Sequence, residues 1–231
     1  MTVNQLNIES ISRNGDCALT VNFVPNDSCV ALIHTLCTDL LRKPLPDLLN
    51  LIPAFNSLTL VFKFPVNQLT IVYEQLLLRL DEIQLGVFVP KTHYMPTCYH
   101  PDVAADLLDV CRHLGLEVDD LIERHAGQTY QIAMLGFLPG FAYLNENHQT
   151  LYLNRKASPS LHVQAGSVAI AGKQTGIYSL ASPGGWHVIG MTPKKVLNWQ
   201  NQHHPMLLNP LDQVVFNPID LVEYQSLKNE S

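Results

Sequence analysis

The residues with the clearest functional signal lie in the second half of the chain, where most of its glycines gather. Eight of the twelve glycines fall between Gly136 and Gly190, within two apolar and aromatic runs, MLGFLPGFAYL (residues 134–144) and GSVAIAGKQTGIYSLASPGGWHVIG (residues 166–190). Glycine permits positive φ and close backbone approach, so such a cluster is typical of a shaped surface. We therefore expect the functional site to be built from these two runs.

Few ionisable side chains are available to such a site. Arg155 and Lys173 are two candidate cations in or near the glycine-rich region before Lys194. An anionic ligand that docks there needs one of them, and their alternative role is solubility. His125 falls in the last turn of an expected helix, where the helix dipole favours a cation, and it is also a candidate catalytic acid or base.

The second run contains two turn signals. Gly184–Gly185 indicates either a turn or a set of backbone N–H groups that bind an anion or a carbonyl oxygen. Thr175–Gly176 indicates another turn, flanked by Gln174 and Tyr178. In Trp186–His187, the alternation of side chains along a strand directs one of the two inward.

The GSVAIAGKQ segment looks like a phosphate-binding loop, but its spacing argues against one. A Walker loop has four residues between its glycines and Ser or Thr after the lysine. Here five residues separate Gly166 from Gly172, and Gln174 follows Lys173. The GxGxxG, HExxH and GxSxG motifs are also absent, so the sequence gives no support to dinucleotide-binding, zincin or hydrolase-elbow sites.

The composition disfavours nucleic acid as a partner and leaves a protein partner open. The net charge is −6, and no cationic run is longer than Lys194–Lys195, so a nucleic-acid backbone finds no basic surface. Charged residues make up 15% of the chain, against about 25% in typical soluble domains. This deficit indicates either a surface hidden against a partner or one rich in uncharged polar residues.

Cysteine usage and apolar run lengths are typical of a cytoplasmic protein. The five cysteines are widely spread, without a CxxC pair or the Cys/His spacing of a zinc site. They indicate buried thiols in a reducing compartment, and we expect no metal site. The first ten residues lack the pattern of a secretory signal, and no apolar run reaches the roughly 18 residues of a spanning helix. We therefore expect no contact with a membrane.

Strand and helix signals alternate in the first 85 residues, which predicts an N-terminal α+β sandwich domain. The expected elements are a hairpin with strands around residues 6–8 and 19–23, a helix over 28–41 capped by Asp27 or Ser28, a short strand near Leu51, a strand over 58–64 and a helix over 67–83 capped by Asn67.

The rest of the chain predicts a mainly β domain. A short strand over 87–90 and helices over 101–113 and 118–126 come first, and Gly127 ends the second helix. From Thr129 onward, short β-type runs separated by glycine and proline turns indicate a closed or barrel-like body. The predicted organisation is therefore an N-terminal domain over 1–85, a second domain over 86–225 and a loose tail over 226–231.

Two segments of the glycine-rich region resemble the signature of a known family. YQIAMLGFLPGFAYL and AGSVAIAGKQTGIYSLASPGGWHVIGMTP are similar to the PxpB/KipI family, also called the allophanate hydrolase subunit 1 or carboxyltransferase C/D domain family. The similarity extends from about Pro96 to Phe216, whereas the N-terminal part is similar only in element order. The resemblance implies an N-terminal α+β domain and a C-terminal cyclophilin-like β-barrel domain.

The resemblance also implies an activity. Family members are similar to subunits of a 5-oxoprolinase that opens 5-oxo-L-proline to L-glutamate using ATP, in which a PxpB-type chain acts with PxpC-type and PxpA-type subunits. It implies ATP bound by the assembly, no biotin on this chain, a site at the PxpC-like interface and a chain that is inactive alone. The alternatives are a KipI-like inhibitor of a sensor histidine kinase and a carboxyltransferase or allophanate hydrolase subunit.

Matching the family pattern residue by residue gives the candidate site. His125 falls at a histidine position of the pattern and is the candidate catalytic residue. Together with the cations noted above, the candidate substrate-binding residues are Gly136, Pro139, Gly140, Phe141, Arg155, Lys173, Gln174, Thr175, Tyr178, Gly184, Gly185 and Trp186. Between the two strings the chain departs from the pattern, with Asn154 and Gln164 in place of prolines and Ser160 in place of an arginine. Any change of substrate or partner is expected to arise there.

Overall fold

The computed structural model describes residues 7–26, 28–66, 69–82 and 88–230. The contacts divide the chain into two compact units, Met1–Val89 and Pro90–Ser231, and each is described by itself. The expected caps at Asp27 and Asn67, and the expected boundary between residues 85 and 86, lie outside the described residues.

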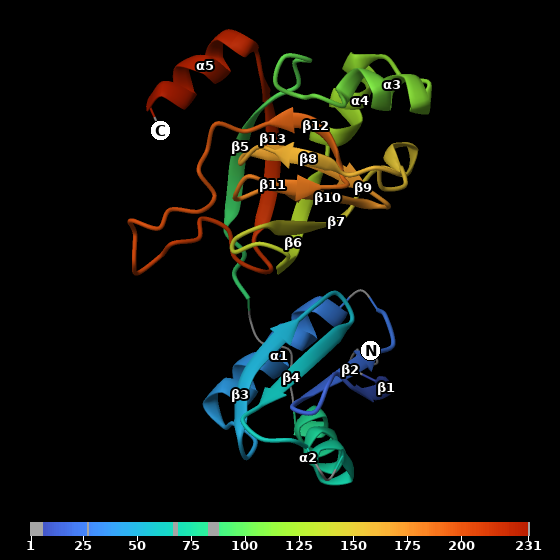
Figure 1. The fold of residues 1–231 in the computed structure, drawn as a ribbon, viewed down its shortest axis with the longest axis vertical. Helices are drawn as coiled ribbons and strands as arrows, with labels where there is room; N and C mark the ends of the chain where they lie inside the picture. The colour runs from blue at the N-terminus through green and yellow to red at the C-terminus, as the bar shows by residue number, and fades with distance from the viewer. Residues whose placement is uncertain (1–6, 27, 67–68, 83–87, 231) are drawn as a thin grey trace. The chain divides into compact units, whose positions relative to one another are not determined.

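The first unit is a four-stranded antiparallel sheet with two helices (Figure 1). Its elements are β1 (Ile8–Arg13), β2 (Ala18–Phe23), α1 (Cys29–Arg42), β3 (Leu48–Pro53), β4 (Ser57–Phe62) and α2 (Leu69–Glu82). The sheet order is β1-β2-β4-β3, so the predicted hairpin of β1 and β2 is present. Alternate residues of β2 and β4 are buried with α1 in one apolar cluster, as the period-two pattern predicts.

Leu41 and Phe64, which end the expected helix over 28–41 and the expected strand over 58–64, both point outward. Leu41 is 73% exposed because the buried stripe of α1 passes through Ile33, Leu36 and Leu40 instead. Phe64 is 62% exposed because β4 ends at Phe62, before the pleat reaches it.

The second unit is a closed seven-stranded barrel with helices packed against it (Figure 1). Around the barrel the strand order is β10-β7-β6-β13-β5-β12-β9, and a separate two-stranded ribbon pairs β11 with β8. The elements are β5 (Thr92–Cys98), α3 (Leu107–Leu114), α4 (Val118–Ala126), β6 (Thr129–Leu135), β7 (Ala142–Glu146), the 3₁₀ turn η1 (Gln149–Leu151), β8 (Ser160–Val163), β9 (Ser167–Ala171), β10 (Gln174–Ile177), β11 (Ser182–Gly184), β12 (His187–Met191), β13 (Gln213–Ile219) and α5 (Leu221–Glu230).

The barrel closes through a long-range strand pair. β13 runs parallel to β5 and antiparallel to β6, while the other neighbours are antiparallel. One buried cluster draws a residue from nearly every barrel strand: Met95, Ile132, Leu144, Val168, Ile177, Val214 and Phe216. α3 packs on β12 and α4 on β13. The barrel expected from the glycine-punctuated β runs is therefore present.

Some of the expected helix and strand bounds in this part of the chain match the structure, and others do not. α4 spans Val118–Ala126 and is followed by Gly127, as predicted. Of the strand expected over 87–90, the described residues 88–90 are not in a strand: Phe88 and Val89 are exposed, and the strand starts at Thr92. The helix expected over 101–113 begins at Leu107, since residues 101–103 form a turn.

Two further expectations are corrected. Thr175–Gly176 is not a turn but the middle of β10, which pairs with β9 on one side and β7 on the other. Residues 226–230 are not a loose tail but the end of α5. Tyr224 anchors that helix, since its side chain is buried in a cluster with Cys98 and Met191.

A partly buried hydrogen bond between Asp212 and His93 holds the start of β13 to β5. Asp212 Oδ2 lies 2.8 Å from His93 Nε2, and Asp212 Oδ1 accepts the backbone N–H of Lys91. Burial favours the neutral carboxyl, but the hydrogen bonds from His93, Lys91 and Asn209 outweigh it and lower the pKa of Asp212 from its usual 3.8.

Asp212→Asn should lower the unfolding free energy of this unit by about 1–2 kcal/mol at neutral pH. Because the native pKa of Asp212 is the lower one, its contribution is present above about pH 4 and disappears as the pH falls through that native pKa. Denaturant titrations at several pH values measure this. Asp102→Asn removes an exposed carboxylate beside His100 and should have little effect; equal losses in both variants would contradict the prediction.

Candidate functional site

A small pocket lined with aromatic rings lies where the two glycine-rich runs meet. Its volume is about 280 Å³. We call it the aromatic pocket, and its lining residues are Phe137, Phe141, Tyr143, Arg155, Pro159, Tyr178, Pro183, Gly184, Gly185 and Trp186. Six of the sequence-predicted residues therefore come together here: Phe141, Arg155, Tyr178, Gly184, Gly185 and Trp186.

Phe141 is the centre of the aromatic cluster. Its ring makes edge-on contacts with Tyr143 at 4.6 Å, with Tyr178 at 4.9 Å and with Trp186 at 5.7 Å between centroids. Phe137, which is 61% exposed, adds a further edge-on contact at the rim. Edge-to-face geometry is the favoured arrangement for aromatic pairs, so the cluster forms a stiff apolar wall.

The loop between β6 and β7 carries these rings through an unusual backbone. Phe137 has φ 64 and Gly140 has φ 77, both in the left-handed region. The carbonyl of Pro139 accepts a hydrogen bond from Ser179 Oγ at 2.7 Å, and the carbonyl of Phe141 accepts the N–H of Gly136. Gly136, Pro139 and Gly140 therefore shape the loop rather than line the pocket.

Two glycines leave room for the rings. A Cβ at Gly176 would lie 2.6 Å from Phe141 Cζ, and a Cβ at Gly184 would overlap the Tyr178 hydroxyl. Because a side chain at either position must displace an aromatic ring, the glycines follow from close packing and not from turn geometry.

Arg155 brings the positive charge of the aromatic pocket. Its Cζ lies 5.9 Å from the centroid of the Trp186 ring, within range of a cation–π interaction. The backbone on either side is fastened: His187 Nε2 lies 2.9 Å from the carbonyl oxygen of Asn154, and the N–H of Lys156 donates to the carbonyl of Gly185. The guanidinium is therefore presented from a fixed segment.

A half-buried ion pair fixes the same segment to the barrel. Lys156 Nζ lies 2.6 Å from Asp106 Oδ1 and donates to Ser160 Oγ at 2.8 Å. The other Asp106 oxygen accepts the backbone N–H of Val188. Ser160, which departs from the family pattern, thus accepts a hydrogen bond from the lysine next to Arg155.

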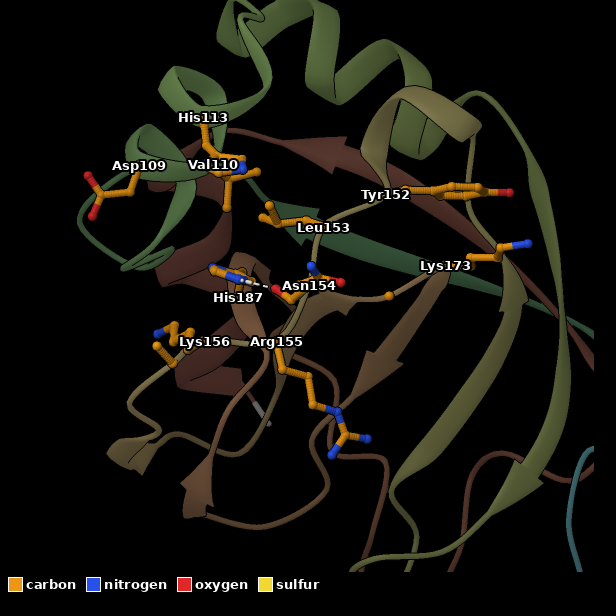
Figure 2. Close-up of a pocket in the computed structure, with 12 residues that line it drawn as sticks. Asp109, Val110, His113, Tyr152, Leu153, Asn154, Arg155, Lys156, Lys173 and His187 are labelled. Carbon is orange, nitrogen blue, oxygen red and sulfur yellow. Dashed lines mark hydrogen bonds between the residues drawn. The ribbon is translucent and has the colours of Figure 1, made fainter.

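A larger polar cavity of about 630 Å³ adjoins this segment (Figure 2). We call it the polar cavity, and its lining residues are Asp109, Val110, His113, Tyr152, Leu153, Asn154, Arg155, Lys156, Ala157, Gly172, Lys173 and His187. Arg155 lines both cavities, and in Figure 2 its guanidinium extends away from Asn154 and His187. The two cavities therefore share one cation.

Lys173 lies at the far side of the polar cavity from α3. Its ammonium is 5.5 Å from the Tyr152 ring centroid and 3.5 Å from Glu146 Oε1. Both charged side chains are mostly exposed, so this pair contributes little to stability. Lys173 remains able to turn toward a ligand.

The two tyrosines of the aromatic pocket are neutral at physiological pH. Burial raises the pKa of Tyr143 and of Tyr178. The positive charge of Arg155 partly opposes this at Tyr143, and a backbone hydrogen bond with Trp186, followed by the charge of Arg155, partly opposes it at Tyr178. Both phenols keep their proton and can donate a hydrogen bond to a ligand oxygen.

His125 and Thr175 lie elsewhere, in a buried hydrogen-bonded network. His125 Nδ1 lies 2.8 Å from the Tyr99 hydroxyl and Nε2 lies 3.1 Å from Thr175 Oγ1. Thr175 donates to Asn147 Oδ1, which also accepts the Tyr130 hydroxyl. Neither residue lines the aromatic pocket or the polar cavity.

The environment of His125 changes its expected role. The side chain is fully buried, and this burial lowers its pKa to about 3. At neutral pH the ring is uncharged, so it does not compensate the dipole of α4 as a cation. Its hydrogen bond to Thr175 connects α4 to β10, which indicates a structural role for this histidine.

Sequence reasoning missed residues that complete the two cavities. One predicted residue, Gln174, is half-buried in β10 and lines neither cavity.

The residues that the sequence did not single out are Phe137, Pro159 and the Lys156–Asp106 pair. The aromatic GFLPGFAYL string was the available signal for Phe137, whereas the ion pair joins residues 50 positions apart and leaves no local signal.

The described residues contain no group of three or more His, Cys, Asp or Glu side chains arranged to hold a metal ion. Within the same parts of the chain, no helix is long and apolar enough to cross a membrane.

Comparison with protein families places most of the chain in one family model. Residues 9–208 match the model described as carboxyltransferase domain, subdomain C and D. A curated relative from Bacillus subtilis, named as the B-type subunit of 5-oxoprolinase, is 33% identical over 96% of this chain and 97% of its own length. A protein of the same name from Escherichia coli O157:H7 is 35% identical over 75% of this chain and 79% of its own.

Solved structures share the fold. TTHA0988 superimposes with a TM-score of 0.74 at 32% identity, over 88% of this chain but 40% of its own length. A conserved uncharacterized protein from Pyrococcus horikoshii is 33% identical with a TM-score of 0.55, over 93% of this chain and all of its own. The urea carboxylase of Kluyveromyces lactis has a TM-score of 0.77 at 19% identity, over 95% of this chain and 22% of its own, which shows a common fold alone.

Proposed function

The chain belongs to the PxpB/KipI family of carboxyltransferase C/D-type proteins, and from this premise we propose that it is a subunit of a heteromeric, ATP-dependent 5-oxoprolinase that opens 5-oxo-L-proline to L-glutamate. One observation carries the proposal: a relative named as a 5-oxoprolinase subunit matches nearly end to end. The proposed partners are PxpA-like and PxpC-like subunits, the proposed setting is the cytoplasm, and the proposed type of barrel is cyclophilin-like.

The aromatic pocket suits a small cyclic amide with a carboxylate. A five-membered lactam presents flat faces to rings such as Phe141 and Trp186, while a carboxylate accepts the parallel N–H donors of Arg155. The neutral hydroxyls of Tyr143 and Tyr178 can donate to the lactam oxygen. In this proposal, the chain binds and orients the substrate.

The same pocket argues against independent activity. Among the described residues that line it there is no carboxylate, histidine, cysteine or serine, so a nucleophile or general base must come from elsewhere. A site completed by a second subunit meets this need. TTHA0988, in which this chain's counterpart occupies less than half of a longer polypeptide, is consistent with such a shared arrangement.

ATP has a clear chemical purpose in the proposed reaction. An unstrained lactam is a poor electrophile, and transfer of a phosphoryl group from ATP to its oxygen makes the ring carbon more electrophilic. Water then adds to that carbon, the C–N bond breaks with the amine as the leaving group, and a second water hydrolyses the resulting acyl phosphate to the carboxylate of L-glutamate and free phosphate. We assign the nucleotide to the assembly, without a particular site on this chain. No metal or biotin is proposed for it.

Reconstitution tests the proposal directly. The chain is co-expressed with PxpA-like and PxpC-like subunits, and glutamate formed from 5-oxo-L-proline is measured with and without ATP. We expect glutamate only when all three subunits and ATP are present, and none from the purified chain alone.

Two outcomes would contradict this proposal. Turnover by the isolated chain would show that no shared site is needed. Full activity of the other subunits without this chain would remove it from the enzyme. A chain that instead inhibits autophosphorylation of a sensor histidine kinase, and leaves 5-oxoproline untouched, would support the KipI-like alternative.

A further inference from the structure

A third cavity of the barrel unit lies between α5 and the segment that follows β12. Its volume is about 260 Å³. We call it the lysine cavity because Lys194, Lys195 and Lys228 all line it. It shares no lining residue with the aromatic pocket or the polar cavity, so it is a separate place on the molecule.

The charged side chains among the described residues that line this cavity are all lysines. None of the described residues that line it is acidic, although the whole chain has more carboxylates than cations. Lys194 Nζ donates to the carbonyl of Tyr94 at 2.9 Å, and Lys228 Nζ lies 5.5 Å from the Tyr224 ring centroid. Both contacts are to neutral groups, so they orient the ammonium ions without cancelling their charge.

A buried hydroxyl, that of Thr192, supplies a donor beside these charges. Thr192 is 3% exposed, and its Oγ1 accepts the backbone N–H of Lys194 at 3.3 Å. A hydroxyl that accepts in this way can still donate its own hydrogen to a ligand. Ser179 Oγ, buried at the same cavity, is oriented by its bond to the carbonyl of Pro139.

The wall of the cavity is held by close backbone packing. Gly166 has φ 87, and a Cβ there would lie 2.5 Å from the carbonyl oxygen of Thr192. The N–H of Thr192 donates to the carbonyl of Gly166, and the N–H of Gly166 donates to the carbonyl of Tyr178. The hydroxyls and the backbone therefore occupy fixed positions, as a binding site requires.

We propose that the lysine cavity binds a phosphate-class oxyanion. Lys194 and Lys228 bring two exposed ammonium ions to this cavity, and an anion with several acceptor oxygens can accept hydrogen bonds from both of them and from the buried Thr192. Free phosphate or pyrophosphate and the phosphates of a nucleotide share this chemistry. The proposal does not depend on the 5-oxoprolinase role.

Calorimetric titration of the full chain tests this inference. Potassium phosphate, pyrophosphate and ATP are titrated separately at constant ionic strength. We expect saturable binding that Lys228→Gln and Lys194→Gln each weaken by about tenfold. Lys228→Arg keeps the charge and should keep the binding. Lys91→Gln, which removes an exposed cation outside the cavity, should leave it unchanged.

The titrations also distinguish the sources of the anion. Tighter binding of pyrophosphate than of ATP indicates a free anion, and the reverse order indicates a nucleotide. The proposal is overturned if none of the three anions binds saturably, or if Lys91→Gln weakens binding as much as Lys228→Gln. Thermal unfolding of each variant without anion confirms that a loss of binding does not come from a loss of fold.

Discussion

Lowering the pH from 6.5 to about 5 should reduce the unfolding free energy of the barrel unit by about 2 kcal/mol through His125 alone. Burial lowers the pKa of His125 to about 3 in the folded protein, against 6.5 for an exposed histidine. Below pH 6.5 the unfolded chain binds a proton that the folded chain does not. The contribution of His125 to the unfolding free energy is therefore fully present above pH 6.5. It decreases as the pH falls and stops decreasing near pH 3, where the folded state is also protonated.

Denaturant titrations followed by tryptophan fluorescence measure this effect. Both tryptophans, Trp186 and Trp199, lie in the barrel unit, so the signal reports that unit's unfolding. In His125→Gln the difference in stability between the two pH values should shrink by the same amount, because the titrating group is gone. This variant should also be less stable at pH 7 by about 1–3 kcal/mol, since the contacts of the ring to Tyr99 and Thr175 are weakened.

His162→Gln is the matched control. His162 lies on β8 and is exposed, so the unfolding free energy of this variant should change with pH as it does in the unaltered chain. If His125→Gln retains the full pH dependence, His125 is not the buried neutral group that the structure indicates.

Local sequence patterns predicted the elements whose signals lie within a few residues. The hairpin of β1 and β2 follows from strand signals on either side of a turn, and the end of α4 follows from the glycine after it. The barrel could be expected from the density of short β runs. Its closure through the parallel pairing of β5 with β13 joins residues about 120 positions apart and could not be read locally.

The candidate site was only partly predicted, because only some of its residues belong to local sequence patterns. Phe141, Tyr178 and Trp186 stood out because they belong to recognisable strings, and the structure brings them together with Arg155. Gly176 looked like a turn residue, but its glycine is required by the rings that pack against it. Sequence reveals the need for glycine and not whether a turn or close packing is its cause.

His125 shows a second limit. Its position in the last turn of a helix suggested a cation, because local sequence does not reveal burial. The surroundings that keep its ring neutral come from Tyr99, Thr175 and Phe216, which lie far apart along the chain.

Arg155→Gln should lower kcat/KM for 5-oxo-L-proline by about 100-fold in the reconstituted assembly, mainly through KM. The described lining of the pocket has no other cation, so loss of the guanidinium leaves the substrate carboxylate without its charged partner. Arg155→Lys keeps the charge but loses the planar pair of donors, and an intermediate loss is expected. Arg13→Gln, an exposed cation of the first unit, should leave both kinetic constants unchanged.

A fluorescence measurement separates substrate binding from structural damage around Arg155. In a Trp199→Phe background Trp186 is the sole tryptophan of this chain, and it lies beneath the Arg155 guanidinium. An assembly that also carries Trp186→Phe, measured in parallel, gives the signal of the partners' tryptophans. Within the assembly, 5-oxo-L-proline should change its emission saturably, and Arg155→Gln should shift the midpoint to higher concentration by a factor similar to the change in KM. An unchanged midpoint in a variant with an unchanged unfolding transition would mean that Arg155 does not bind the carboxylate, and that the aromatic pocket receives its ligand in another way.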